Sequence, residues 1–266
     1  MNSKSINIIG IPFDEKSSYQ RGPALGPDSI RETLHDQSSN YWTESGVNLD
    51  VDVQIKDKGN LNIQTYDDLL EQIELGYTPG EANIFLGGDH SVSYPIVKTI
   101  SKHHQNFDIL HIDAHTDLYD SFEGDRHSHA CPFARIMEDG LCKRLIQVGI
   151  RTLTKHQREQ AEKYKVEVIM MKDIETFSLL KFNRPVYMSI DLDGFDPAFA
   201  PGVSHHEPGG MNPRTLINFL LKKEFFLLAA DIVELNPLRD HERMTAALAA
   251  KLLKELCAKF YANPEI

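Results

Sequence analysis

Short apolar runs alternate with amphipathic segments along almost the whole of this sequence, and that alternation predicts the fold. The runs that read as strands span residues 6–11, 84–86, 109–112, 145–148, 166–170, 186–190 and 226–230. Candidate helices lie at 27–35, 66–75, 92–102, 132–139, 156–164, 213–221 and 244–260. Strands that alternate with helices favour a parallel sheet covered on both faces. Since no repeat or low-complexity linker divides the chain, we expect residues 1–266 to form one α/β domain, a three-layer α/β/α sandwich on a mostly parallel sheet.

The composition excludes several classes of protein. Lysine and arginine number 28 against 39 aspartates and glutamates, for a formal net charge of −11, and no basic stripe that would favour nucleic acid appears. The longest apolar run, residues 225–230, is far too short to span a membrane. Three cysteines without paired spacing favour reduced thiols and a cytoplasmic location. The acidic excess is compatible with a small cationic substrate or with bound metal cations.

Polar residues that follow an apolar run are the first place to look for a site, because ligands of such sheets bind at the carboxyl ends of the strands. The run 109–112 is followed by Asp113, His115 and Asp117. In an extended segment these three side chains project to the same side, since the period of a strand is two. An isolated Asp and His at this spacing would indicate only a solvated loop. Here two more predicted strands end in polar residues of the same kinds.

The second strand end carries Asp191 and Asp193 after the run 186–190. Carboxylates on one face repel each other unless a cation or a proton lies between them. The third strand end, after 84–86, carries two glycines that fit a tight turn with close backbone approach, and His90 follows them.

Together the three strand ends supply four carboxylates and two imidazoles, and no thiol belongs to the set. A structural zinc site is therefore unfavourable, whereas mixed Asp and His ligation suits harder divalent ions such as manganese. Six ligands are too many for one open catalytic ion but suit two ions bridged by carboxylates. A pair of this kind acidifies a water, which attacks an electrophilic carbon or phosphorus.

These residues resemble the motifs of the ureohydrolase (arginase/agmatinase) family. The matching segments are GGDHS at 87–91, DAHTD at 113–117, SIDLDGFDPAFAPG at 189–202 and DIVELNP at 231–237. The segments SFEGDRHSHACPFARIM and GVSHHEPGG look most like those of plant-type arginases. The resemblance covers nearly the whole chain. It implies a three-layer α/β/α fold, two Mn²⁺ ions per chain, and hydrolysis of a guanidino group to urea and an amine.

The resemblance also implies a role for each site residue. Each ion would have two terminal ligands and share two bridging carboxylates: His90 with Asp117, His115 with Asp193, and Asp113 with Asp191 as bridges. Asp117 would in addition accept a hydrogen bond that orients the attacking hydroxide. Glu234 matches the family glutamate that pairs with the substrate guanidinium, and a carboxylate is a natural partner for that planar group. His129 matches the histidine that protonates the departing amine.

The substrate stays open between arginine, our first choice, agmatine, and another guanidino acid. Arginine carries an α-carboxylate and an α-amine where agmatine has a single terminal amine, so loops must distinguish the two. We expect the segment 119–127 to contribute to specificity, because Arg126 could attract a carboxylate and three acidic residues could attract an amine. We also expect His205 or His206 to form a wall of the substrate pocket near the far end of the substrate.

Two other functions compete with the ureohydrolase hypothesis. A zinc deacetylase of related fold would use one metal ion, whereas this set offers ligands for two. A non-catalytic binding subunit would be expected to have lost ligands, and none of the six is missing. By resemblance we expect a homo-oligomer, a trimer or a hexamer, with no nucleic-acid or membrane partner.

Overall fold

A single parallel sheet organises the computed structural model, which describes residues 5–37 and 39–263. Within those residues the sheet has eight strands in the order β2-β1-β3-β8-β7-β4-β5-β6, and every neighbouring pair is parallel. The strands are β1 (Ser5–Gly10), β2 (Gln54–Asn60), β3 (Ala82–Leu86), β4 (Asp108–Ile112), β5 (Arg144–Ile150), β6 (Glu167–Met170), β7 (Val186–Asp191) and β8 (Leu227–Val233).

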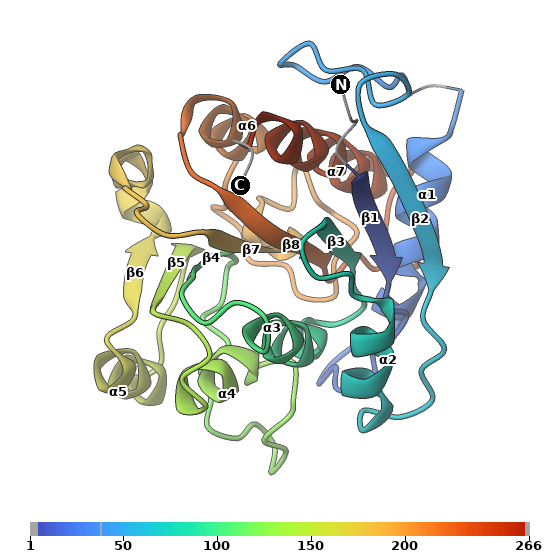
Figure 1. Ribbon diagram of the computed structural model, residues 1–266. Helices are drawn as coiled ribbons and strands as arrows, with labels where there is room; N and C mark the ends of the chain where they lie inside the picture. Colours follow the sequence, from blue (N-terminus) through green and yellow to red (C-terminus); the bar gives the residue numbers. More distant parts are fainter. Residues whose placement is uncertain (1–4, 38, 264–266) are drawn as a thin grey trace.

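Helices cover both faces of this sheet, which confirms the predicted three-layer sandwich. On one face α2, α3, α4 and α5 pack in sequence, and on the other α7 packs against α1 and α6 (Figure 1). Their bounds are α1 (Gly26–Leu34), α2 (Asp68–Gly76), α3 (Ser93–Ser101), α4 (Pro132–Glu138), α5 (Lys155–Tyr164), α6 (Pro213–Lys222) and α7 (Met244–Ala262). Shorter 3₁₀ helices occupy Pro23–Leu25, His90–Val92, Met171–Leu179 and Leu192–Gly194.

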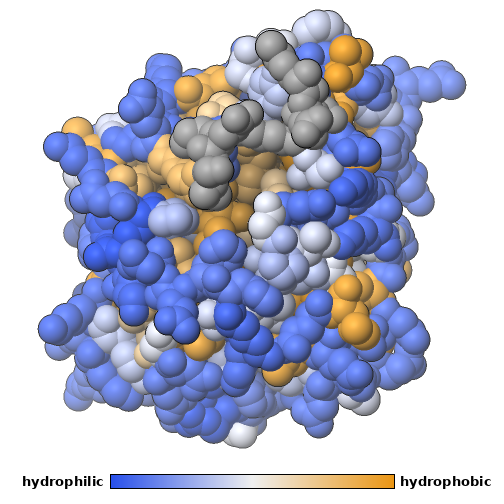
Figure 2. Space-filling view, viewed as in Figure 1, coloured by the Kyte–Doolittle hydropathy of each residue, from blue (hydrophilic) through white to orange (hydrophobic). Residues whose placement is uncertain are grey.

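The polarity of the surface and the character of the helices agree with the sequence, which has no apolar run long enough to span a membrane. Hydrophilic residues cover most of the face shown in Figure 2. None of the helices in the described ranges combines the length and the apolarity that a membrane-spanning segment needs.

All seven predicted strands and all seven predicted helices are present, each within a few residues of its expected bounds. Start signals explain several of these bounds. α6 begins after Asn212, whose side-chain Oδ1 accepts a hydrogen bond from the backbone N–H of Thr215 at 3.1 Å, and Pro213 follows as the first helical residue. α5 begins with a reciprocal capping box between Thr154 and Gln157.

Strand β2 was not predicted, and its sequence explains why. QIKDKGN contains one apolar residue, and nearly all of the strand is exposed at the edge of the sheet. A strand without a buried face lacks the alternation of apolar and polar residues that sequence analysis depends on. Lys56 and Lys58 suit an edge, since charged side chains there discourage pairing with another chain.

The two faces of the central strands are lined by different residues. On β4, Leu110 and Ile112 pack into the core cluster that includes α6 and α7, whereas Ile109 packs into the cluster that includes α3 and Phe133 of α4. His111 shares the second face with Ile109 because side chains alternate along a strand. Asp113 continues that face beyond the end of the strand.

Gly88 is needed for close backbone approach, as the paired glycines suggested. A Cβ atom at this position would lie 1.7 Å from the backbone oxygen of Phe13. The backbone N–H of the next residue, Asp89, donates to that same oxygen at 2.8 Å. The turn after β3 is therefore held against the segment after β1, and this contact fixes the position of His90.

We predict that Gly88→Ala lowers the free energy of unfolding by about 3 kcal/mol, because no flexible side chain can move aside to relieve the clash. Urea denaturation measures the change. Gly140→Ala is the matched control: Gly140 has a φ of 64°, and no atom of the described residues would lie within 4 Å of the added methyl group. Gly140→Ala should lower the free energy of unfolding only by the cost of placing alanine in left-handed backbone, about 1 kcal/mol. Equal losses in the two variants would contradict the close approach.

Candidate metal centre

The candidate site lies at the carboxyl ends of four strands that are neighbours in the sheet. β3, β8, β7 and β4 stand in that order, and each is followed directly by site residues. His90 follows β3, Glu234 follows β8, and the carboxylates Asp191 and Asp193 close β7 and open the turn after it. The segment after β4 supplies Asp113, His115 and Asp117. Residues separated by up to 144 positions therefore converge on one edge of the sheet.

One group of side chains surrounds the imidazole of His90. Its Nδ1 lies 3.1 Å from Asp117 Oδ2, 3.1 Å from Asp191 Oδ2 and 3.3 Å from Asp113 Oδ2. All four residues are buried. Among the described residues this nitrogen makes no well-aligned hydrogen bond, so it points between the three carboxylates rather than at one of them.

A second group surrounds His115. Its Nδ1 lies 3.1 Å from Asp193 Oδ2 and 3.5 Å from Asp113 Oδ1. Asp113 thus presents one oxygen to each group, which is the arrangement expected of a bridging carboxylate. Ligand atoms of Asp113, His115 and Asp193 all lie within 4.8 Å of one another. The structure therefore brings together all six residues that the sequence proposed as ligands.

Burial and mutual repulsion make this set of carboxylates a strong candidate for binding cations. Burial raises the pKa of Asp191 well above its usual range, and the charges of Asp193 and Asp113 add to the rise. Burial likewise raises the pKa of Asp193 to about 6. A cation between the carboxylates would favour their charged forms. Oxygen and imidazole donors without a thiol fit Mn²⁺, so the residues present match the group that the motifs imply.

The tautomer of His90 is set by residues behind it. Ser189 Oγ donates to Asp231 Oδ1 at 2.6 Å, so the same hydroxyl is available to accept the N–H of His90 Nε2, 3.0 Å away. The lone pair of His90 Nδ1 then faces the carboxylates, as a metal ligand requires. Asp231 is anchored by Tyr187 and by Ser93 Oγ, which donates at 2.6 Å. A ring nitrogen backed in this way is typical of metal-binding histidines.

Glu234 and His129 form a buried pair beside the two ligand groups. Glu234 Oε1 accepts from the backbone N–H of His90 at 2.9 Å and lies 3.0 Å from His129 Nδ1. The other ring nitrogen of His129 lies 2.8 Å from Ser18 Oγ. Burial lowers the pKa of His129, but the hydrogen bond to Glu234 and the charges of Glu234, Asp89 and Asp117 together outweigh it and raise that pKa to about 9. Burial raises the pKa of Glu234, but the hydrogen bonds to His129 and to the backbone of His90, together with the charges of these two residues, lower it below its usual value.

Two of these functional residues have strained backbone. Asp117 has a φ of 48° and Glu234 a φ of 64°, in the left-handed region that residues other than glycine rarely adopt. Such conformations cost about 1–3 kcal/mol each and gather at functional sites. The turns after β4 and β8 thus direct these two carboxylates at an energetic cost.

The specificity loop 119–127 behaves differently from the expectation. Arg126 Nη1 bonds both carboxylate oxygens of Asp120 at 3.0 Å, and its Nη2 bonds Glu138 at 2.7 Å. Asp125 pairs with Lys16 at 2.7 Å. Each of these three charged residues therefore has an ion-pair partner in the structure, and the contribution of the loop to specificity stays a prediction.

His205 does lie at the site, as expected of a pocket wall. Its ring centroid is 5.4 Å from that of His129 and 6.2 Å from that of His115. Tyr19 covers it from the other side at 5.5 Å. His206 is instead exposed, and its Nε2–H donates to the backbone oxygen of Pro201 at 2.7 Å.

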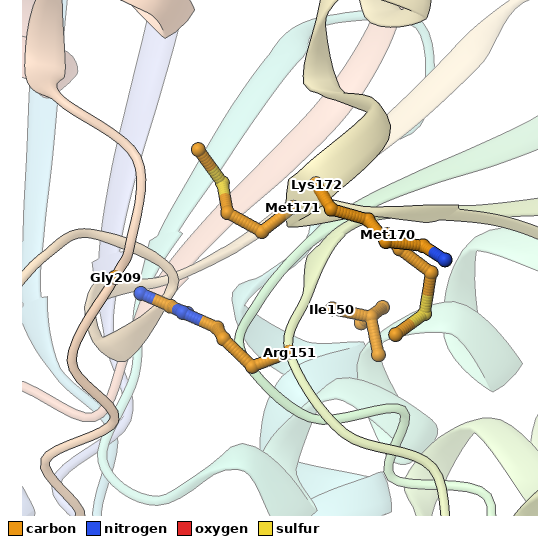
Figure 3. Close-up of a pocket in the computed structure, with 6 residues that line it drawn as sticks. All are labelled: Ile150, Arg151, Met170, Met171, Lys172 and Gly209. Atoms are coloured by element: carbon orange, nitrogen blue, oxygen red, sulfur yellow. The ribbon is translucent and has the colours of Figure 1, made fainter.

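A pocket of about 370 Å³ lies at the ends of β5 and β6 and is lined by Ile150, Arg151, Met170, Met171, Lys172 and Gly209 (Figure 3). Its wall includes Arg151, whose Nη1 donates to the backbone oxygen of Asp193 at 2.9 Å and whose Nη2 donates to that of Phe195 at 3.0 Å. A Cβ atom at Gly210 would lie 1.7 Å from this guanidinium. Arg151 therefore supports the turn from outside, and none of the candidate ligands lines this pocket.

Sequence analysis missed four buried residues that support the ligands: His111, Gln147, Ser189 and Asp231. His111, Gln147 and Ser189 lie within predicted strands, and Asp231 directly follows the predicted run 226–230. A signal for two of them was present, since His111 stands two residues before Asp113 and Ser189 two residues before Asp191. Residues at that spacing share a face of the strand, so the face that carries ligands extends back into the sheet.

We predict a pH-dependent contribution of His129 to stability in protein kept metal-free with a chelator. The folded state binds this proton more tightly than the unfolded chain, whose histidine pKa is near 6.5. The contribution is therefore complete below pH 6.5 and is lost as the pH rises through about 9. Urea denaturation of the wild type and His129→Gln should show a difference on the order of 2–3 kcal/mol at pH 6 that shrinks towards pH 9.5. His103→Gln, at an exposed position between α3 and β4, is the matched control. A difference that grows with pH would refute the pairing.

Comparisons with known proteins identify the family. The model of the arginase family matches residues 4–258. The mitochondrial arginase 1 of Oryza sativa subsp. indica is 45% identical over 273 residues, which cover 95% of this chain and 80% of the rice protein. The mitochondrial agmatinase of Gallus gallus is 30% identical, over 94% of this chain and 79% of its own length. The structure of arginase from Medicago truncatula superposes with a TM-score of 0.92 at 40% identity, covering 97% of this chain and 88% of that one. This chain therefore belongs to the arginase family of hydrolases.

Proposed function

We propose that this chain hydrolyses L-arginine to L-ornithine and urea with two bound Mn²⁺ ions. The observation that carries the proposal is Glu234, a buried carboxylate that contacts His90 and His129 and belongs to neither ligand group. Four aspartates are committed to the cations, so a cationic substrate that enters between them needs a further negative charge. Both hydrogen bonds that the side chain of Glu234 makes within the described residues go to Oε1, which leaves Oε2 for a second partner.

The chemistry follows from the placement of these side chains. When bound, the two manganese ions supply hydroxide from water at neutral pH. Glu234 holds the guanidinium plane, and Asp117 accepts a hydrogen bond that orients the hydroxide towards the guanidino carbon. As the new C–O bond forms, the bond from that carbon to the chain nitrogen breaks. His129 keeps a proton at neutral pH because of its bond to Glu234, and it gives that proton to the departing amine.

Two observations support manganese as the metal. The donors are carboxylate oxygens and imidazole nitrogens, a mixture that suits Mn²⁺ better than the all-oxygen shells of Mg²⁺. The shared carboxylate Asp113 joins the two ligand groups, which supports two ions rather than one. A single zinc ion, as in a deacetylase, would leave one of these groups without a function.

The support for arginine over agmatine comes from similarity. Identity to the rice arginase is 45%, against 30% for the chicken agmatinase, over nearly the same share of this chain. Arg126 of the loop 119–127 forms ion pairs with Asp120 and Glu138, and Asp125 forms one with Lys16, so we look beyond these charges for recognition of the far end of the substrate. His205, whose ring lies beside those of both His129 and His115, is the residue we propose for that role. A trimeric or hexameric state and a cytoplasmic location stay predictions.

The test is a side-by-side assay of urea release from arginine and agmatine. We expect no activity after treatment with a chelator, recovery with Mn²⁺, and poorer recovery with Mg²⁺ at the same concentration. With Mn²⁺, kcat/KM for arginine should exceed that for agmatine by at least about tenfold, or about 1.4 kcal/mol of transition-state binding. A preference for agmatine would replace the proposed substrate, and equal rescue by Mg²⁺ would contradict the proposed metal.

We predict that Glu234→Gln lowers kcat/KM about 10²- to 10³-fold while the protein retains its Mn²⁺. The variant keeps the size of the side chain but removes the charge, and loss of one partner of a buried charged pair costs about 2–4 kcal/mol. Enzyme assays combined with metal analysis measure both effects. Glu123→Gln is the matched control, since Glu123 is exposed and also has a positive φ of 51°. Near-normal kcat/KM in Glu234→Gln would show that the guanidinium is held elsewhere.

A further inference from the structure

His111 is a third buried imidazole at the edge of the metal centre, and its role is separate from that of His90 and His115. Its Nε2 lies 2.7 Å from Asp113 Oδ2. Ligand atoms of His90, His111 and Asp113 fall within 4.8 Å of one another, so distance alone would allow His111 to bind a metal ion. Whether it can do so depends on which ring nitrogen carries the hydrogen.

Gln147 on β5 determines that hydrogen. Its side-chain nitrogen Nε2 lies 2.6 Å from the backbone oxygen of Thr116, and a carbonyl oxygen only accepts hydrogen bonds. The amide nitrogen, not the amide oxygen, therefore occupies this position. The same nitrogen lies 3.0 Å from His111 Nδ1 and has a second hydrogen to donate there. Because Nδ1 accepts, the neutral ring carries its one hydrogen on Nε2.

The ring is also held mechanically. His111 is completely buried, and its ring stacks on Phe133 of α4 with centroids 3.8 Å apart and an angle of 25° between the planes. The ring of His90 meets it edge-on at 4.9 Å. Phe133 and His90 thus fix the plane of the ring, and the hydrogen-bond partners of its two nitrogens direct Nε2 at Asp113.

We propose that His111 is a positioning residue: its Nε2–H donates to Asp113 Oδ2 and fixes the carboxylate that bridges the two ligand groups, with Gln147 setting the tautomer. A nitrogen that carries a hydrogen has no lone pair to offer a cation, so His111 is excluded as a ligand. Asp113 Oδ1 is fixed from the other side, because it accepts the backbone N–H of His115 at 2.5 Å. Both oxygens of the bridge are therefore oriented before any cation binds.

This inference rests on the proposed metal centre, and it predicts how much His111 contributes to the affinity of that centre for Mn²⁺. Groups that orient metal ligands contribute about 10- to 100-fold to metal affinity. Removal of the His111 donor should weaken Mn²⁺ binding by that amount. Since Asp113 belongs to both ligand groups, the loss should affect both ions and not one of them.

Three variants test the proposal. Each metal-free protein is titrated with Mn²⁺ in a calorimeter, which measures the binding affinity. His111→Leu removes the donor, and we expect Mn²⁺ affinity to fall about 10- to 100-fold. His111→Gln keeps an N–H donor in place of Nε2 and should recover the affinity to within a few-fold of the wild type. His103→Leu removes an exposed histidine between α3 and β4 and should have no effect. Unchanged affinity in His111→Leu would overturn the proposal, as would equal losses in the Leu and Gln variants.

A second measurement needs neither a variant nor a metal. In ¹⁵N-labelled metal-free wild type, the ring of His111 should appear in NMR spectra as the tautomer protonated at Nε2, with slow exchange of that hydrogen. A ring protonated at Nδ1 would overturn the inference even if His111→Leu failed to fold. Failure of the wild type to bind Mn²⁺ would instead contradict the proposed function, so the two outcomes can be told apart.

Discussion

Carboxylates crowded into a buried volume are the constraint on which the rest of this structure depends. Asp113, Asp117, Asp191 and Asp193 meet at one edge of the sheet, and Glu234 lies next to them. Such a cluster is unfavourable without positive charge, because burial and repulsion both oppose ionisation. The sheet order satisfies part of this demand by bringing His90, His115 and His129 to the same edge. The remaining charge is what two divalent cations and a guanidinium would supply.

Orientation at this edge comes from the interior of the sheet. Two hydrogen-bonded pairs support the ligands from behind: Asp231 with Ser189 behind His90, and Gln147 with His111 behind Asp113. Both pairs lie on the face of the sheet that packs against α3 and α4. Each pair occupies neighbouring strands, so the ligands are aligned by the register of the sheet. Arg151 adds a third support by holding the backbone of the turn that carries Asp193. The positions and orientations of the ligand side chains therefore depend on the whole sheet and not on the loops alone.

The sequence predicted the parallel sheet, its two helical layers and the convergence of six ligands, because each of these depends on local patterns. Apolar runs mark buried strands, and polar residues directly after them mark the carboxyl edge. Strand β2 has no buried face and so carries no pattern. The spacing of His111 and Ser189 placed them on the ligand face, but it did not show their roles, because their partners Gln147 and Asp231 lie 36 and 42 residues away in the sequence. The ion pairs of Arg126 with Asp120 and Glu138 likewise depend on the tertiary structure, so the sequence alone did not predict them.

The positive φ angles of Asp117 and Glu234 have a consequence for redesign of this centre. Side chains branched at Cβ are the least tolerant of left-handed backbone, whereas glycine, asparagine and aspartate accept it most readily. A saturation library at either position would therefore combine two effects, the lost carboxylate and the refolding of the turn. Substituting asparagine at Asp117 and glutamine at Glu234 separates them, since each keeps the shape and the backbone preference of the original. Any attempt to retune the centre towards a different cation would begin with those two amides and leave valine, isoleucine and threonine out of the library.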